Sequence, residues 1–222
     1  ADTNLAADDD LIREWILERV RASIRFANEL DARCLVVHPG WTTATDRFMK
    51  GRAWALNLRS LRWLLRYAEE YGVDMLIENV PRPTPYLLIS AEDFELFYVE
   101  MEQPMGMVLD VAHANLNGDL VDAVRKLGNR IITLHVSDND GKDERHWLPF
   151  EGVIDWKGFI SALQEVGYSG PFLYEAKVKA QTPHRVAEIL KRNYKKVMTS
   201  PSKGSEGPPR RPERPAERRR AV

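Results

Sequence analysis

The chain has 222 residues, 32 Lys/Arg, 33 Asp/Glu and a formal net charge of −1, so no overall field favours nucleic acid or a membrane surface. It is long enough for one domain with a substantial core, and its single cysteine, Cys34, excludes an internal disulfide and a thiolate metal cage. No apolar run reaches the ~18 residues of a membrane span. The acidic N-terminal stretch lacks the apolar segment of a signal peptide. We therefore expect a cytoplasmic protein.

The first elements in chain order are a helix, a strand and a second helix. Residues 8–30 have an apolar periodicity typical of a helix. Residues 33–40 (RCLVVHPG) form a short apolar run closed by Pro-Gly, which predicts a buried strand. A helix over 52–71 stops at Gly72. The helical spacing in the first segment rests on Leu11, Trp15, Val20, Ile24 and Ala27.

The same alternation continues to the end of the folded part. Strands are predicted at 73–81 (VDMLIENVP), 105–113 (MGMVLDVAH), 130–138 (RIITLHVSD) and 171–177 (PFLYEAK). Helices are predicted at 91–101, 119–127, 156–167, with Asp155 as N-cap, and 183–198. The strand runs are apolar without alternation and are separated by helices, a pattern that indicates an α/β protein with parallel strands covered on both faces.

The last segment, residues 200–222, differs from the rest in composition. It is rich in Pro, Gly and Arg, and holds seven Lys/Arg against three Glu. Such a segment cannot bury enough apolar surface to fold, so we expect a disordered tail after one domain at 1–199. An electrostatic arm for nucleic acid or an acidic partner is the alternative to a solvated extension, which we favour.

The predicted strands share a feature at their carboxyl ends, where each finishes on a residue that can ligate a metal. In parallel α/β folds these ends converge, so the five side chains are expected to meet. Carboxylates buried together require a cation or shared protons. An oxygen-rich set with imidazole suits a divalent ion such as Mn²⁺, Mg²⁺, Co²⁺ or Zn²⁺. The five residues are His38, Glu78, Asp110, His135 and Glu175.

Five motifs in this order resemble the xylose-isomerase-like TIM-barrel superfamily. They are VVHPG, LIENVP, LDVAHANLNGD, LHVSDNDGKDERHWLPFEGVIDW and FLYEAK, and the resemblance covers about residues 4–194. That superfamily holds sugar and sugar phosphate isomerases and epimerases, and also the endonuclease IV type of abasic-site nuclease. The resemblance implies a (β/α)₈ TIM-barrel type of fold, here N-terminally truncated to about five βα units.

The resemblance also assigns roles to particular residues. It makes Glu78, Asp110, His135 and Glu175 the ligands of a central metal, with Glu78 and Glu175 also acting as catalytic base and acid. The superfamily's nuclease pattern has Asp two residues before the histidine of the fourth motif, where this chain has Glu144; Asp143 is the alternative if the loop is shifted. The positions implied for substrate binding or an accessory metal are His38, His113, Glu144 and His146.

Three functions remain open at this point. The first is a divalent-metal-dependent isomerase or epimerase of a small sugar or sugar phosphate. The second is an endonuclease IV-like phosphodiester hydrolase at abasic DNA, and the third is an inactive metal-binding remnant. The body of the chain is net acidic and a nuclease needs a basic surface, so we favour the isomerase. A homodimer is a further hypothesis, from tryptophans that could lie outside the core: Trp41, Trp54, Trp63 and Trp147.

The strand count conflicts with a closed barrel, which needs eight βα units. Five strands leave open sheet edges at 34–37 and 172–175, with unpaired backbone groups and apolar surface. We expect either about sixty to ninety further residues in the native protein, from the size of three βα units, or a partner that closes the barrel.

Overall fold

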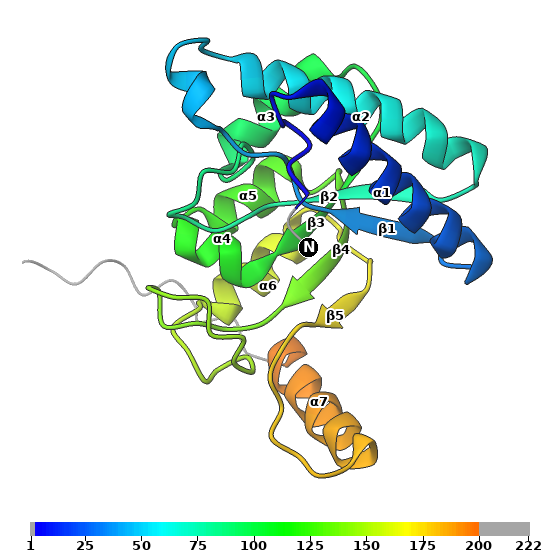
Figure 1. Ribbon diagram of the computed structural model, residues 1–222. Coiled ribbons are helices and arrows are strands. Elements are labelled where there is room, and N and C mark those ends of the chain that lie inside the picture. Colours follow the sequence, from blue (N-terminus) through cyan, green and yellow to red (C-terminus); the bar gives the residue numbers. More distant parts are fainter. Residues whose placement is uncertain (1–2, 200–222) are drawn as a thin grey trace, which may run out of the picture.

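The computed structural model describes residues 3–199, and within them five parallel strands form one curved sheet, a half-barrel (Figure 1). The strand order follows the sequence, and each neighbouring pair is parallel. This confirms the expected α/β class and strand number. The strands are β1 (Cys34–Val37), β2 (Asp74–Glu78), β3 (Gly106–Asp110), β4 (Ile131–Val136) and β5 (Phe172–Tyr174).

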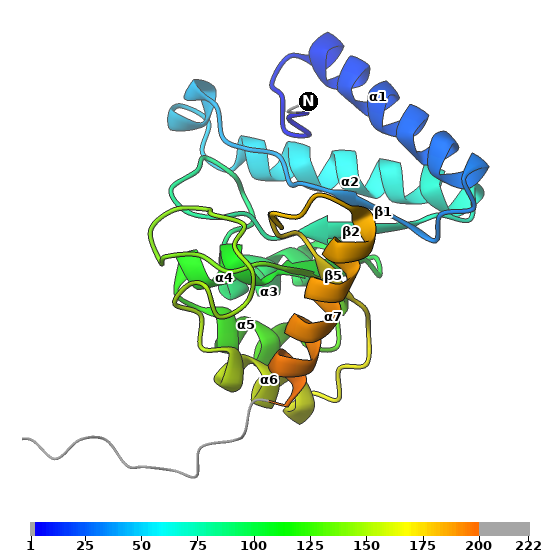
Figure 2. The same cartoon turned by 90° about the horizontal axis from the view of Figure 1, so that it is seen from below.

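Helices form an outer half ring around this sheet (Figures 1 and 2). No helix within residues 3–199 is both long and apolar enough to cross a bilayer. The predicted tail at 200–222 lies outside the described residues and stays a prediction. The helices are α1 (Asp10–Glu29), the 3-10 helix η1 (Ala44–Arg47), α2 (Arg52–Glu70), α3 (Ala91–Met101), α4 (Val111–Asn117), α5 (Leu120–Leu127), α6 (Trp156–Glu165) and α7 (Pro183–Met198).

Local capping chemistry fixes many of the helix boundaries. The Asp9 side chain accepts a hydrogen bond from the third residue of α1, and Asp155 caps α6 as predicted. Ser90 and Asp93 form a reciprocal capping box at the start of α3. Gly72 follows α2 with φ of +66°, a left-handed conformation that glycine adopts at low cost.

One bound of the predicted elements is wrong. The run predicted as a strand at 105–113 is a strand only up to Asp110, the residue expected at its carboxyl end. Val111 already begins α4, because the Asp110 side chain caps that helix by accepting from the His113 N–H. In α1, Leu11 and Trp15 follow the helical spacing but are 83% and 64% exposed.

The two edges of the sheet are less buried than its centre. Met107 and Val108 of β3 are fully buried, whereas every residue of β1 is partly exposed and Leu173 of β5 is 54% exposed. Among residues 3–199, β1 pairs only with β2 and β5 only with β4. The open edges expected at 34–37 and 172–175 are therefore present in the described part of the chain.

Candidate metal centre

Four strands bring ligating side chains to one point at the carboxyl end of the sheet. Glu78 ends β2, Asp110 ends β3, His135 is the next-to-last residue of β4, and Glu175 directly follows β5. Asp110 and His135 are register partners, so neighbouring strands present them at the same level. One oxygen or nitrogen atom from each of the four residues lies within 4.8 Å of every other.

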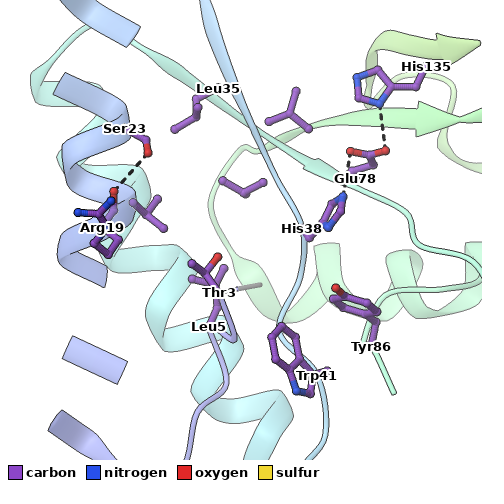
Figure 3. A pocket seen from close by; sticks show the side chains of 13 residues that line it. Thr3, Leu5, Arg19, Ser23, Leu35, His38, Trp41, Glu78, Tyr86 and His135 are labelled. Carbon is purple, nitrogen blue, oxygen red and sulfur yellow. Dashed lines mark hydrogen bonds and ion pairs between the residues drawn. The ribbon is translucent and has the colours of Figure 1, made fainter. Parts of the chain in front are cut away.

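Imidazole groups flank the Glu78 carboxylate on both sides. The Nδ1 atom of His135 lies 3.0 Å from Oε1 of Glu78 and 3.2 Å from Oε2 of Glu175. On the other side, Nε2 of His38 lies 3.4 Å from Oε2 of Glu78, and Figure 3 shows both contacts. Because carboxylates only accept here, the Nδ1 atom of His135 carries a proton that a metal ion would displace.

These contacts shift the protonation equilibria of the site. Burial alone would raise the pKa of Glu78, but hydrogen bonds from His135 and His38 outweigh it and lower this pKa to about 2. Burial works against the charged form of His135, but Glu175 and Glu78 raise its pKa to about 10. In the metal-free site the positively charged imidazolium of His135 therefore stabilises the negative charge of the neighbouring carboxylates.

Asp110 provides the structural test of whether a cation fits. Its side chain is fully buried, and its Oδ1 atom accepts from the His113 N–H at 2.8 Å. Its Oδ2 atom is buried without a hydrogen-bond partner in the described part of the chain. Burial raises the pKa of Asp110 to about 7, only partly opposed by His113. A buried carboxylate oxygen without a partner, in a residue grouped with two further carboxylates, needs a positive partner.

The spacing of the four ligand atoms agrees with one ion. Two ligands on opposite sides of a divalent ion, each ~2.0–2.6 Å away, stand roughly 4–5 Å apart. The observed limit of 4.8 Å falls in this range. The residues present therefore fit a single divalent cation held by three carboxylates and one imidazole, a donor set typical of Mn²⁺, Mg²⁺, Co²⁺ or Zn²⁺ sites.

A second group of side chains lies beside the first. The Oε1 atom of Glu144 is 3.2 Å from Nε2 of His113 and 2.9 Å from Nε2 of His146. His113 donates from Nδ1 to the Asn79 carbonyl at 2.8 Å. The sequence left Glu144 and Asp143 open for this position; Glu144 lies here, whereas Asp143 pairs with an arginine. The accessory role of the group stays a prediction.

Burial and charge also set the protonation of this second group. Burial would lower the pKa of His113, but Glu144 and Asp110 raise it to about 9. The His113 contact in turn lowers the pKa of Glu144 below its usual range. His113 lies 3.9 Å from Glu78 through its Nδ1 atom, so the second group adjoins the first.

The loop over residues 137–155 presents Glu144 and His146 to the site. Its organising residue is Asp138, which is fully buried and accepts from the N–H groups of Asn139, Phe150 and Ile154 and from the Trp156 indole at 2.8–3.2 Å. In the sequence Asp138 closes the run predicted as a strand at 130–138, and it was assigned no role. Only the presence of an acidic residue just after a strand could have drawn attention to it.

Asn79 is another residue that the sequence analysis did not single out. Its Oδ1 accepts from the Asp110 N–H at 2.7 Å, and its Nδ2 donates to the Asp110 carbonyl at 3.1 Å. Its own carbonyl orients His113. Asn79 thus fixes the backbone of one candidate ligand and the ring of its neighbour. The feature of the sequence that could have identified Asn79 was its position directly after the candidate ligand Glu78.

A cavity of about 460 Å³ opens beside the cluster and extends along the free edge of β1 to helix α1 (Figure 3). His38, Glu78 and His135 line one end of it. Trp41 and Tyr86 stand at the same end, with their ring centroids 5.4 Å apart. Of the five strand-end residues, His38 is thus beside the cluster but outside the four-residue group.

The fold and the position of the site define a protein of the α/β-barrel class. The chain belongs to the family described as the xylose isomerase-like TIM barrel, whose model matches residues 1–196. The resemblance inferred from the five motifs is thereby confirmed.

Individual relatives agree with this assignment. The uncharacterized protein MJ1311 of Methanocaldococcus jannaschii is 31% identical over 200 residues, covering 86% of this chain and 66% of that protein. D-psicose 3-epimerase of Ruminiclostridium cellulolyticum is 28% identical over 184 residues, covering 81% of this chain and 61% of the enzyme. The crystal structure of a D-tagatose 3-epimerase-like protein matches with a TM-score of 0.78 and 29% identity, covering 89% of this chain and 75% of that one. The chain thus spans about two thirds or less of MJ1311 and of the D-psicose 3-epimerase.

Proposed function

We propose that the protein is a divalent-metal-dependent isomerase or epimerase of a small sugar or sugar phosphate. The observation that carries the proposal is the meeting of Glu78, Asp110, His135 and Glu175 within 4.8 Å at the carboxyl ends of four strands. The similarity to a D-psicose 3-epimerase supports a small sugar as the substrate class.

The chemistry of this class is the removal of a proton next to a carbonyl and its return to a neighbouring carbon or the opposite face. A divalent ion supplies positive charge that stabilises the negative charge developing on the substrate oxygens. In our proposal Glu78 and Glu175 are the base and the acid. Hydrogen bonds from His135 lower the pKa of both carboxyl groups in the metal-free site, so either can accept the substrate proton near neutral pH. The carboxyl group that has accepted this proton is then the acid that can return it.

The remaining residues position this pair. Asp110 is held by Asn79 through two backbone hydrogen bonds, and His135 touches both proposed catalytic carboxylates. Glu78 and Asp110 are themselves buried. Such preorganisation places proton donor and acceptor without cost at the moment of reaction.

The test is deuterium uptake from D₂O into a panel of ketoses and ketose phosphates, followed by NMR after metal removal and Mn²⁺ addition. We expect uptake only with the ion, and a loss of at least ~100-fold in Glu78→Gln and in Glu175→Gln, since a positioned acid or base contributes this much. The matched control is Glu188→Gln on α7, whose partner is a surface arginine. Metal-independent uptake, or full uptake in both site variants, would refute the proposal.

Phosphodiester hydrolysis remains a second candidate function, and the group formed by His113, Glu144 and His146 supports it. It adds further potential ligands beside the first four, as hydrolases with several metals require. Metal-dependent cleavage of a duplex with an abasic site, abolished in Glu144→Gln, would favour this candidate. Metal binding by calorimetry without uptake or cleavage would instead favour the inactive remnant.

A further inference from the structure

Glu175 is less enclosed than the other two clustered carboxylates. Its side chain is 48% exposed, against 5% for Glu78 and 1% for Asp110. It lies just beyond β5, a strand of three residues that pairs only with β4 in the described part of the chain. On its β4 side the Glu175 N–H donates to the Val136 carbonyl at 3.1 Å. The position of this carboxylate therefore depends on what else holds its backbone.

His146, in the loop over residues 137–155, contacts the same stretch of backbone. Its Nδ1 atom lies 2.9 Å from the Glu175 carbonyl oxygen. Because that oxygen only accepts, Nδ1 carries the proton and donates. The carbonyl of His146 in turn accepts from the Lys177 N–H at 2.7 Å. Two hydrogen bonds thus tie one loop residue to the segment 175–177.

The backbone of His146 adopts a conformation that side chains seldom take. Its φ is +53°, in the left-handed region, which raises the free energy of a residue other than glycine. Such a conformation persists only where neighbouring contacts impose it. The next residue, Trp147, forms a bridge of two hydrogen bonds, at 2.8 and 3.0 Å, with Asp138 just after β4. The loop therefore joins the ends of β4 and β5 through two successive residues.

A further link between this loop and β5 runs through α7. The Asn193 side chain accepts from the Tyr174 hydroxyl at 2.8 Å and donates to the Pro149 carbonyl at 3.0 Å. Tyr174 directly precedes Glu175. The loop is thus attached both to Glu175 and to the residue before it, which restricts the movement of the end of β5.

We propose that His146 is a positioning residue, whose Nδ1–H holds the Glu175 backbone so that the Glu175 carboxylate stays within the four-residue group. Oε2 of Glu175 lies 3.2 Å from Nδ1 of His135, so a shift of this backbone would separate the carboxylate from the other clustered residues. The inference rests on the proposed function for the part that Glu175 takes in metal binding, but the hydrogen bond can be tested without metal or substrate.

The two ring nitrogens of His146 distinguish this role from direct binding of a metal or substrate. Nδ1 contacts the Glu175 carbonyl, whereas Nε2 lies 2.9 Å from Oε1 of Glu144. The amide nitrogen of asparagine is bonded to Cγ, as Nδ1 is, and that of glutamine is two bonds from Cγ, as Nε2 is. His146→Asn therefore keeps only the donor to Glu175, and His146→Gln keeps only a group near Glu144. His146→Gly removes both groups and also the backbone strain.

The experiment measures the affinity of the full chain for Mn²⁺ by calorimetry and, without metal, the hydrogen exchange of the Lys177 amide. We expect His146→Gln and His146→Gly to weaken Mn²⁺ binding by about 10–100-fold, as loss of a residue that orients a ligand does. Exchange at Lys177 should become roughly tenfold faster in both. His146→Asn should keep both properties close to those of the unchanged chain. The matched control is His184→Asn on α7, whose side chain is 86% exposed.

Three results would overturn the proposal. Weak Mn²⁺ binding in His146→Asn with full binding in His146→Gln would assign Nε2 to the metal. Full binding in His146→Gly, or a lower Tm of the variants at unchanged Mn²⁺ affinity, would leave the side chain no positioning role. Unchanged Lys177 exchange in His146→Gln and His146→Gly would show that the hydrogen bond does not hold this backbone.

Failure of the proposed function gives a different pattern. Absence of deuterium uptake into ketoses would refute that function and leave the ranking of the variants in Mn²⁺ affinity intact. If the unchanged chain binds no Mn²⁺, the exchange of the Lys177 amide alone decides whether His146 holds the end of β5.

Discussion

The centre of the sheet and its α1–β1 flank use the same kinds of residue but differ in burial. At the centre, β2 and β3 are enclosed by helices and deliver Glu78 and Asp110 to a buried point. At the flank, β1 is partly exposed, and so is an apolar face of α1 that includes Leu11 and Trp15. The four clustered residues thus come from β2 to β5, and the edge strand β1 contributes only the neighbouring His38.

The largest effect is expected for a substitution in the loop over residues 137–155, which lies beside the candidate metal centre. Asp138→Ala leaves four N–H donors, three of them in buried contacts, without their acceptor, and we expect a loss of unfolding free energy on the order of 3–5 kcal/mol. Urea unfolding measures it. Asp143→Ala, which changes a side chain that is 66% exposed, serves as the control within the same loop. A loss for Asp138→Ala no greater than for the control would contradict the role given to it.

A core substitution in α1 tests whether the buried side of the flank is as firmly packed as the centre. Ile24 is fully buried, so Ile24→Ala should cost about 2–5 kcal/mol through lost burial and a residual cavity. The shift of the urea midpoint at unchanged slope measures this cost. A cost below 1 kcal/mol would mean that α1 is only loosely attached to the sheet.

Protonation sharpens the comparison, because the two histidines with the most strongly raised pKa values belong to the candidate metal centre and the group beside it. The raised pKa values of His113 and His135, about 9 and about 10, stabilise the metal-free fold below pH ~6.5, and this is lost as pH rises through those values. The raised pKa of Asp110, about 7, acts in the same direction between pH ~4 and 7.

A divalent ion reverses this trend, since binding requires His135 to lose its proton. We expect the increase in Tm caused by Mn²⁺ to be larger at pH 8 than at pH 6, while the metal-free Tm falls over the same interval. Thermal scans with Mn²⁺ and with EDTA measure both. An increase in Tm that is larger at pH 6 would argue against displacement of imidazolium protons.

The smallest effect on the free energy of unfolding is expected for a substitution on the exposed apolar face of α1. Trp15→Ser removes a side chain that is 64% exposed, so the free energy of unfolding of the isolated chain should change by no more than about 0.5 kcal/mol. Comparison of Trp15→Ser with Ile24→Ala on the same helix distinguishes the contribution of the exposed face of α1 to stability from that of its buried face. A loss above 2 kcal/mol would show that the exposed face is already covered.

The sequence predicted the strands and the four clustered residues because both depend on local signals. Each ligand lies at or next to the end of an apolar run, and parallel strands bring such ends together. Helix bounds such as 91–101 and 183–198 were also correct, because capping residues mark them. Binding of a metal by the four residues, and the cytoplasmic location, stay predictions.

The parts that were missed depend on contacts between distant segments. Helix α4 begins without a turn, since Asp110 both ends a strand and caps a helix. The exposure of Leu11 and Trp15 could not be predicted, because they fit helical spacing as well as the buried residues of α1 do. Asp138 could not be told from the acidic residues around it, because its partners Phe150 and Trp156 lie twelve and eighteen positions away.

The indole of Trp156 donates to Asp138 at 2.8 Å from a fully enclosed position. Its emission spectrum should therefore respond to the charge and placement of that carboxylate, so this tryptophan can act as a built-in optical reporter of loop order. With the other tryptophans replaced by phenylalanine, a titration with a divalent salt followed by fluorescence would reveal whether ion loading is communicated from the sheet to the loop above it.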